Sequence, residues 1–365
     1  MIITPRDNYR SLDSWFSGKI RVMVVCDESI HYMKALYDML LKYKDRVIFF
    51  SDFHPNPDYM SVVKGVTAFR EGGCDAVMAV GGGSAIDVAK CIKLFETLPG
   101  TGEDGSWLNA SYEVNNIDLL AMPTTAGTGS EATRYAVIYH NGVKQNITHQ
   151  SIIPRTVLMD PSVLKTLPLY QKKATMCDAL CHAIESFWSI NSTEQSKLYS
   201  RAAIKGVLGS MDGYLSNTDK GNEGMLMAAY KAGQAINITQ TTAGHAMSYK
   251  ITSLFGCAHG HAVMLCDRIL FDWMVRNTSK CCDPRGREYL EDTLDAIGAA
   301  MGCEDAAAGA AMLAGLFDKL ELPVPLATPE QFAELCSGVN KARLKNNPVE
   351  LDNNAVKDLY HMILR

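Results

Sequence analysis

The sequence predicts an α/β domain built on a parallel sheet, followed by a second domain made of helices. Apolar, β-branched runs alternate with helix-like stretches up to about residue 160, and such alternation builds a parallel sheet covered by helices. After Asp160-Pro161 these runs become rare, and amphipathic, alanine-rich stretches continue to the carboxyl end. A chain of 365 residues is long enough for two domains. We therefore expect domains at residues 1–161 and 162–365.

The elements expected in the first domain can be placed along the chain. Strands are predicted at residues 19–26, 46–50, 75–80 and 118–122. Helices are predicted at about residues 29–43 and 59–71. The polar, glycine-rich segment at residues 99–105 is expected to form an exposed turn inside this domain.

The charge and cysteine content limit the class of protein. The net charge of −5 and the pI near 6.0 argue against a nucleic-acid partner, and small molecules or copies of the same chain are expected instead. Eleven cysteines are scattered through apolar or helical stretches, and the amino end lacks a hydrophobic signal segment. This pattern favours reduced cysteines and a cytoplasmic location. No apolar run is long enough to span a bilayer, so no membrane association is expected.

A glycine-rich turn follows the strand predicted at residues 75–80. Gly81-Gly82-Gly83 leads into a helical pattern in which Ser84 is the expected N-cap and Asp87 occupies the capping-box position. Glycines let the backbone approach a diphosphate, and the free N–H groups at a helix start attract its charge. A dinucleotide is the natural ligand. An ordinary strand-to-helix turn is the alternative, and it is the better interpretation of an isolated glycine run.

A second turn strengthens the dinucleotide interpretation. The segment Pro123–Glu131 follows the strand predicted at residues 118–122 and contains Thr124, Thr125 and Thr128. Its hydroxyls and backbone donors suit a ribose or a phosphate, although a polar loop that caps the next helix would look the same. Two such turns at the ends of two strands of one domain favour a nucleotide site.

Four side chains later in the chain are candidate metal ligands. Asp178 and His182 are four residues apart, so a helix would project both from one face. His245 and His259 follow in a glycine-flanked stretch. One oxygen and three nitrogen donors suit Fe(II) or Zn(II) better than calcium. A lone histidine is more often a buried, satisfied side chain, and His259-Gly260-His261 could be a surface loop; only the joint pattern indicates a metal.

These motifs together resemble the iron-containing (group III) alcohol dehydrogenases. The resemblance runs in order from about residue 19 to the carboxyl end. It rests on Gly81–Ser84 with Asp87, Pro123–Glu131, Asp178–Glu185, and Gly244-His245 through His259-Gly260.

The resemblance implies a Rossmann-like dinucleotide-binding domain and an all-helical domain that binds the metal. It implies a metal-dependent alcohol dehydrogenase or aldehyde reductase that transfers hydride between NAD(P)H and a small aldehyde. The expected metal is Fe(II), with Zn(II) as the alternative, and the expected assembly is a homodimer or larger homo-oligomer. The implied metal ligands are Asp178, His182, His245 and His259. The implied cofactor residues are Gly81, Gly82, Gly83, Ser84, Asp87, Thr124, Thr125, Thr128 and Lys144.

Two positions differ from the pattern of the family. Many relatives carry a histidine beside the substrate four residues after the third ligand, where this chain has Tyr249. Tyr249 is therefore the candidate catalytic side chain, to orient the substrate or to pass a proton, although a phenol is a weaker acid–base group near neutral pH. Its alternative role is packing.

The second difference concerns the cofactor. The family position that discriminates against a 2′-phosphate corresponds to Ser51, four residues before the turn at Pro55-Asn56-Pro57. An acidic residue there would repel the phosphate, whereas serine can donate a hydrogen bond to it. We expect NADPH to be accepted and preferred, with NADH as the alternative; the neighbouring Asp52 opposes this preference.

The substrate is the least constrained prediction. The stretch from Gly244 to Ser253 and the segment around Arg343 and Lys345 resemble a branch of the family that includes phosphonoacetaldehyde reductases. Lys250, Arg343 and Lys345 are then candidates to bind an anionic tail, because cations in a dry site select phosphonate, sulfonate or carboxylate. The alternative is that they are solvated surface charges.

Other functions share these features. A polyol oxidase that resembles glycerol dehydrogenase and a lyase that resembles dehydroquinate synthase are the enzymatic alternatives. A non-catalytic oligomer with a structural metal is the alternative from another class. The pair of motifs around Asp178 and Thr124 favours the iron-containing group.

Overall fold

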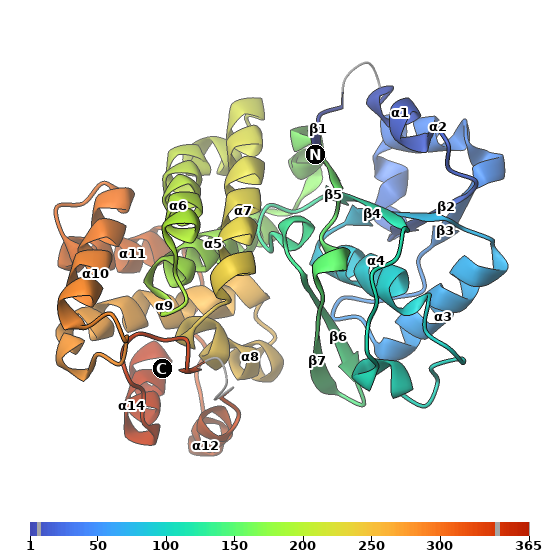
Figure 1. The fold of residues 1–365 in the computed structure, drawn as a ribbon. Coiled ribbons are helices and arrows are strands. Elements are labelled where there is room, and N and C mark those ends of the chain that lie inside the picture. The colour runs from blue at the N-terminus through green and yellow to red at the C-terminus, as the bar shows by residue number, and fades with distance from the viewer. Residues whose placement is uncertain (6–8, 340–343, 365) are drawn as a thin grey trace. The chain divides into compact units, whose positions relative to one another are not determined.

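The computed structural model describes residues 1–5, 9–339 and 344–364 and forms two compact units (Figure 1). The first unit comprises Met1–Thr125 and Gly129–Thr166. The second comprises Ala126–Thr128 and the residues from Leu167 onward. Because these units are defined by compactness alone, they do not test the predicted domain boundary after Pro161, which stays a prediction.

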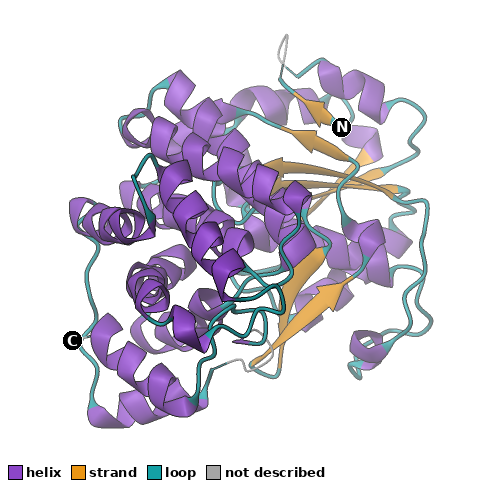
Figure 2. Ribbon diagram, turned by 60° about the vertical axis from the view of Figure 1, so that its left-hand side comes forward, coloured by secondary structure: helices purple, strands orange, loops and turns teal. Residues whose placement is uncertain are grey.

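A six-stranded parallel sheet forms the centre of the first unit, as predicted (Figure 2). Its order is β1-β8-β5-β4-β2-β3, and every neighbouring pair runs parallel. The strands are β1 (Ile2–Ile3), β2 (Val22–Cys26), β3 (Val47–Phe50), β4 (Ala76–Gly81), β5 (Asp118–Pro123) and β8 (Thr156–Leu158). β4 lies between β2 and β5, and its six residues are all buried.

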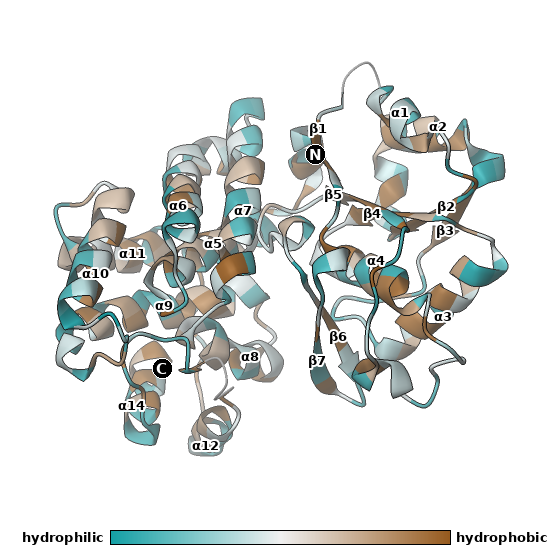
Figure 3. Ribbon diagram, viewed as in Figure 1, coloured by the Kyte–Doolittle hydropathy of each residue, from teal (hydrophilic) through white to brown (hydrophobic). Residues whose placement is uncertain are grey.

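Alternate side chains of the strands supply two separate cores, one on each face of the sheet. Met23 and Val25 face the core beneath helices α3 and α4, whereas Val22 and Val24 face the core beneath α1 and α2. These helices are α1 (Ser11–Phe16), α2 (Lys34–Leu41), α3 (Tyr59–Glu71) and α4 (Gly83–Phe95). The central strands are accordingly hydrophobic along their length (Figure 3).

Two features of this unit differ from the predictions. The single helix expected at residues 29–43 is a 3₁₀ helix, Glu28–Tyr32, followed by α2, because Met33 between them leaves the helical conformation. A hairpin of β6 (Tyr135–His140) and β7 (Val143–Thr148) was not predicted. Asn141 and Gly142, both with positive φ, form its two-residue turn, and Asn-Gly is the sequence signal for such a hairpin.

The second unit is mostly helical in its described residues, which confirms the predicted helical domain. Its helices are α5 (Leu169–Trp188), α6 (Glu194–Leu215), α7 (Asp219–Thr239), α8 (Ala243–Phe255), α9 (His259–Arg276), α10 (Arg287–Met301), α11 (Ala306–Lys319), α12 (Pro329–Ser337) and α14 (Asn353–Ile363). No helix in the described part of the chain is both long and apolar enough to cross a membrane.

Helix α5 lies at the centre of this unit and packs against α6, α7, α9 and α10. Its residues from Met176 to Trp188 are all buried. A helix that is buried on every side normally carries apolar residues. The polar side chains of Asp178, His182 and Glu185 inside this helix therefore need partners from neighbouring helices.

Gly260 allows α9 to approach α5 closely. A Cβ atom at this position would lie 2.1 Å from the Ala174 carbonyl oxygen and 2.8 Å from the Asp178 backbone nitrogen. Both of these atoms belong to the backbone of α5, which cannot move aside without shifting the helix. Glycine therefore fixes the separation of the two helices that carry Asp178 and His259.

We expect Gly260→Ala to lower the free energy of unfolding by about 1–3 kcal/mol, because the new methyl group would overlap the backbone of α5. Gly209 on α6 provides a matched control, because no atom of the described residues lies within 4 Å of a Cβ there. Gly209→Ala should leave stability unchanged or raise it by up to about 1 kcal/mol. Urea unfolding of the two variants, followed by circular dichroism, makes the comparison. Equal stabilities would contradict the close approach of α9 to α5.

Candidate metal and cofactor sites

Three helices bring the four predicted metal ligands together. Asp178 and His182 lie one turn apart on α5, His245 lies on the first turn of α8, and His259 is the first residue of α9. Asp178, His182 and His245 are buried, whereas the side chain of His259 is 39% exposed. The cluster is therefore open to solvent on the His259 side.

One carboxylate oxygen is the centre of the cluster. Asp178 Oδ1 lies 3.6 Å from His245 Nε2, 3.9 Å from His182 Nε2 and 3.9 Å from His259 Nε2. The ligand atoms of Asp178, His245 and His259 all lie within 4.8 Å of one another, a tighter group that leaves out His182. The rings of His182 and His245 are stacked, with centroids 4.5 Å apart.

These separations fit the coordination of a single cation. Metal–ligand bonds of about 2.1 Å place tetrahedral ligand atoms about 3.4 Å apart, close to the spacings around Asp178 Oδ1. Asp178 Oδ1 and His245 Nε2 are buried and have no hydrogen-bond partner within the described residues. Such orphaned atoms are costly to bury, so a bound cation would satisfy them. One oxygen and three imidazole nitrogens match the donors that Fe(II) and Zn(II) accept.

The protonation states of the side chains in the cluster also favour binding of a cation. Burial opposes ionisation of Asp178, but the neighbouring His182, His245 and His259 outweigh it and hold the pKa of Asp178 far below its usual range. Burial lowers the pKa of His182 to about 4, so its ring is neutral near pH 7. An ionised carboxylate beside a neutral imidazole is the state that binds a metal.

Glu185 is a polar residue of this region that the sequence reasoning did not assign. It lies on α5, fully buried, and its carboxylate contacts the ring of His245. A sequence signal was present, because residues four and seven positions after Asp178 share its helix face. His182 and Glu185 occupy those two positions.

Tyr249 lies one turn after His245 on α8. Its ring is stacked parallel to that of His259, with centroids 5.8 Å apart and an interplanar angle of 5°. The side chain is therefore next to the most exposed candidate ligand. The packing role and the substrate role both remain compatible with this position.

The glycine turn of the first unit forms the end of β4 and the start of α4. Gly82 is the N-cap and α4 begins at Gly83, so the prediction of Ser84 as N-cap is wrong. The strand continues through Gly81, which pairs with Pro123 of β5, and the helix starts directly after it. Ser84 lies inside the first turn, with its hydroxyl 3.4 Å from the Asn56 nitrogen.

Asp87 has a different structural role from the one predicted. Because α4 begins at Gly83, Asp87 lies too far along the helix to complete a capping box, and that prediction is wrong. Its Oδ1 accepts a hydrogen bond from Ser130 Oγ at 2.7 Å, and its Oδ2 accepts one from the Val137 nitrogen at 3.0 Å. Asp87 thus ties α4 to β6. Burial raises the pKa of this carboxyl.

The remaining predicted cofactor residues lie around these elements. Thr124 donates its backbone N–H to the Gly81 carbonyl at 3.0 Å, and Thr125 contacts the position of Gly82. Thr128 belongs to the short segment Ala126–Thr128 that groups with the helical unit. Lys144 lies on β7, opposite Tyr139. The charge of Lys144 lowers the pKa of Asp87, but desolvation by burial has the larger effect and raises it overall.

Ser51 and the candidate substrate residues lie near the surface. Ser51 is exposed and follows β3 directly. Lys250, on α8, donates to the Glu334 carboxylate at 2.8 Å, so its charge already has a partner. Lys345 is exposed. Arg343 lies outside the described residues.

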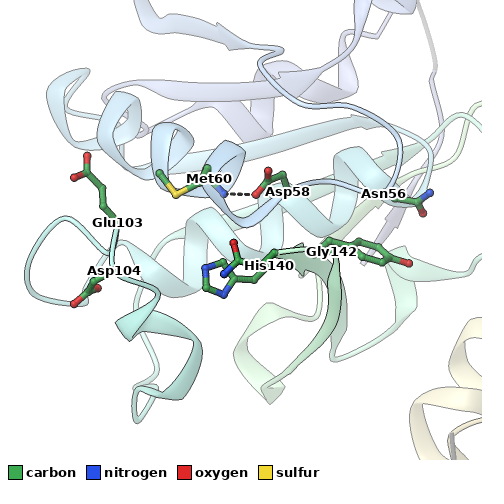
Figure 4. A pocket seen from close by; sticks show the side chains of 9 residues that line it. Asn56, Asp58, Met60, Glu103, Asp104, His140 and Gly142 are labelled. Carbon is green, nitrogen blue, oxygen red and sulfur yellow. Dashed lines mark hydrogen bonds between the residues drawn. The ribbon is translucent and has the colours of Figure 1, made fainter. Parts of the chain in front are cut away.

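A polar hollow of about 620 Å³ lies in the first unit, between the start of α3 and the tip of the β6–β7 hairpin (Figure 4). Asp58, Glu103 and Asp104 line it, and their negative charge makes it unsuited to a diphosphate. Asp58 caps α3 through the Met60 nitrogen, and Asp104 accepts from the Ser106 nitrogen. Two of the three acidic side chains therefore already serve the local fold.

Two family models match the chain in succession. The model for "Iron-containing alcohol dehydrogenase" matches residues 2–161, and the model for "Fe-containing alcohol dehydrogenase family, C-terminal" matches residues 172–364. Together they account for nearly the whole chain and for both units of the fold.

Two proteins that are similar in sequence are named as an alcohol dehydrogenase and as an aldehyde reductase. Alcohol dehydrogenase 4 of Schizosaccharomyces pombe is 30% identical over 308 residues, which are 81% of this chain and 69% of that protein. The phosphonoacetaldehyde reductase of Streptomyces viridochromogenes is 30% identical over 241 residues, 62% of this chain and 60% of that protein. These matches leave about a third or more of each relative unmatched.

Solved structures match this chain over nearly their whole length. The sulfoacetaldehyde reductase of Bifidobacterium kashiwanohense, determined in complex with NAD+, has a TM-score of 0.86 at 26% identity and covers 100% of this chain and 96% of its own. An iron-containing alcohol dehydrogenase from Thermococcus thioreducens has a TM-score of 0.88 at 24% identity, with 100% and 97% covered, and shows the same fold. The family models, the relatives and the fold agree with the motifs of the sequence, and this chain belongs to the iron-containing alcohol dehydrogenase family, a family of oxidoreductases.

Proposed function

We propose that this protein is a metal-dependent aldehyde reductase, or alcohol dehydrogenase, that transfers hydride between a nicotinamide nucleotide and a small aldehyde. The observation that carries the proposal is the cluster of three imidazoles around one buried oxygen of Asp178. In a chain of this family, such a cluster is best explained as a catalytic metal site.

Asp178, His182, His245 and His259 would hold the metal, which we propose to be Fe(II), with Zn(II) as the alternative. A divalent cation bound there would supply a Lewis acid for the substrate oxygen during hydride transfer. The protein supplies the geometry through the packing of α5, α8 and α9. It leaves the His259 side accessible, so a small aldehyde can approach from there.

The first unit would bind the nucleotide through its two turns. Gly81 and Gly82 leave room for a diphosphate, and the free N–H groups at the start of α4 would bind its negative charge. Thr124, Thr125, Thr128 and Lys144 offer hydroxyls and a cation for the rest of the cofactor. Asp87 supports this arrangement through Ser130 and Val137.

The region after β3 supports the use of NADPH. Ser51 places a hydroxyl rather than a carboxylate at the discriminating position. The neighbouring Asp52 forms an ion pair with Lys64 at 2.7 Å, which reduces the repulsion that its charge would exert on a 2′-phosphate. We therefore propose that NADPH is preferred and NADH is accepted.

Anaerobically reconstituted Fe(II) protein should oxidise NADPH when a short aldehyde is added, with a kcat/KM for NADPH above that for NADH. Nicotinamide absorbance measures both reactions. Asp178→Asn, which removes the central charge of the cluster, should abolish turnover, whereas Asp212→Asn on the exposed surface of α6 should not. Absence of any absorbance change with aldehyde or alcohol would contradict a dehydrogenase and favour a lyase.

Tyr249 would orient the substrate or pass a proton to water. Its place beside His259 and one turn from His245 puts the phenol next to the accessible side of the cluster. A phenol oxygen can hold a proton at hydrogen-bond distance from a substrate oxygen, whereas the ring alone cannot.

Tyr249→Phe keeps the ring and its stacking on His259 but removes the hydroxyl. We expect kcat to fall by about tenfold or more and its pH dependence to change, because a general acid–base group contributes at least this much. Steady-state kinetics across the pH range measure both quantities. Full turnover with an unchanged pH profile would show that Tyr249 only packs.

We propose further that the aldehyde carries an anionic tail. Two similar proteins, named for phosphonoacetaldehyde and sulfoacetaldehyde, support this class of substrate. Lys250 lies on the turn after His245, and Lys345 is exposed. Glu334 competes with such a tail for Lys250, because the two side chains form an ion pair.

This competition gives opposite expectations for two variants. Lys250→Met should reduce kcat/KM for phosphonoacetaldehyde about tenfold or more, because a charge-assisted hydrogen bond is lost, and should leave a neutral aldehyde of similar size unaffected. Glu334→Gln frees Lys250 and should raise kcat/KM for the phosphonate. Equal effects of each substitution on the charged and neutral aldehydes would contradict this role of Lys250.

The proposal also includes the cellular location of the protein, its assembly and its domains. All eleven cysteines are free, and this agrees with a reducing compartment such as the cytoplasm. We propose a homodimer or larger homo-oligomer, and residues 1–161 and 162–365 as the nucleotide-binding and metal-binding domains.

A further inference from the structure

We propose that Glu185 is a positioning residue for the metal: it orients the ring of His245 and fixes which ring nitrogen carries the hydrogen. This inference rests on the proposed metal site. Glu185 comes from α5 and has no exposed surface. A buried carboxylate needs several hydrogen bonds to offset its desolvation, so its partners indicate what it does.

The carboxylate of Glu185 accepts hydrogen bonds from four groups at the start of α8. Its Oε1 lies 3.0 Å from the His245 backbone nitrogen and 2.5 Å from His245 Nδ1. Its Oε2 lies 2.7 Å from Thr242 Oγ1 and also accepts from the Thr242 backbone nitrogen. Two oxygens with four surrounding donors match the acceptor capacity of an ionised carboxylate.

The direction of these bonds is fixed by a tryptophan. Trp188 Nε1 lies 2.8 Å from Thr242 Oγ1, and an indole N–H can only donate. Thr242 Oγ1 therefore accepts from Trp188 and turns its own hydrogen toward Glu185. With the backbone N–H of His245 also aimed at Oε1, the carboxylate is held as an acceptor on all sides.

An acceptor at Glu185 determines the state of the His245 ring. Nδ1 must carry the hydrogen that it donates to Oε1, which leaves a lone pair on Nε2 when the ring is neutral. Nε2 lies 3.6 Å from Asp178 Oδ1 and is buried without a hydrogen-bond partner in the described residues. The lone pair is therefore directed at the centre of the cluster, as a metal ligand requires.

Gly244 makes this contact possible. A Cβ atom at this position would lie 1.8 Å from Asp267 Oδ1 and 2.8 Å from Glu185 Oε1. Only glycine lets the first turn of α8 approach both carboxyl groups. Asp267 is also fully buried, and desolvation raises its pKa well above the usual range.

Glu185 also caps α8 through the backbone of Thr242 and His245, and a purely structural role must be separated from the metal role. A cap affects the stability of the protein with or without metal. A positioning role also affects the affinity of the folded protein for the ion and the geometry of the bound ion. Glutamine is the informative replacement, because it keeps the shape but replaces one acceptor oxygen by a donor that would face other donors.

The experiment is a Co(II) titration of the full-length, metal-stripped protein, read from the visible absorption of the bound ion. Glu185→Gln should weaken Co(II) binding by about 10- to 100-fold and alter the spectrum, as expected when the partner of a metal-bound histidine is lost. Thr242→Val, which removes one donor to Glu185, should weaken binding less, by about two- to tenfold. If Glu185→Gln does not fold, the result for Thr242→Val decides.

Asp283→Asn is the matched control. Asp283 is buried in the same unit and pairs with Arg285 at 2.7 Å, so its loss should lower stability without changing Co(II) affinity or the spectrum. Co(II) affinities equal to wild type in both test variants would overturn this inference and leave the metal site standing. Failure of the wild-type protein to bind one Co(II) would overturn the metal site itself, and this inference with it.

Discussion

The structure of the second unit depends on burying the carboxylate of Asp178 inside its central helix, α5, where Glu185 is a second buried carboxylate. A charge in a low-dielectric interior is tolerated only with close partners of opposite charge or a metal. Here three imidazoles from α5, α8 and α9 surround Asp178 Oδ1, and a cation bound among them would supply the opposite charge. The helices must approach closely to bring them together, and glycines at positions 244 and 260 make this possible. The same oxygen is thus the point around which the three helices bring their imidazoles together and the centre of the proposed chemistry.

In the first unit, the start of α4 has no side-chain cap. β4 is buried between β2 and β5, and it ends at Gly81. Gly82 is the N-cap of α4 and offers no side chain to cap the helix. Free N–H groups at such a start are satisfied by an anion as readily as by a capping side chain. Asp87, Ser130 and Lys90 then connect α4 to the loop before β6. Lys90 is fully buried, and desolvation lowers its pKa to about 8.

Much of this could be predicted from the sequence, where the signal is local or periodic. The spacing of Asp178 and His182 predicted a shared helix face, and buried apolar runs predicted the central strands. The cap at Ser84 was wrong because strand pairing through Gly81 and Pro123, a contact distant in sequence, sets where α4 begins. The hairpin was not predicted, although Asn141-Gly142 is the typical sequence of its two-residue turn. The contacts of Glu185 were not predicted, because its partners Thr242 and His245 lie at the start of α8, and the sequence does not show that α8 packs against this face of α5.

The convergence of the ligands itself was not a local property, and the joint pattern of the four residues and the resemblance to a known family supported it in advance. Its most direct test is anomalous diffraction at the iron absorption edge from crystals of the Fe(II)-loaded protein. We expect one anomalous peak within bonding distance of Asp178 Oδ1 and of Nε2 of His182, His245 and His259. A peak elsewhere in the chain, or a cation held by Cys177 and Cys181, the two buried cysteines of α5, instead of the imidazoles, would contradict this expectation.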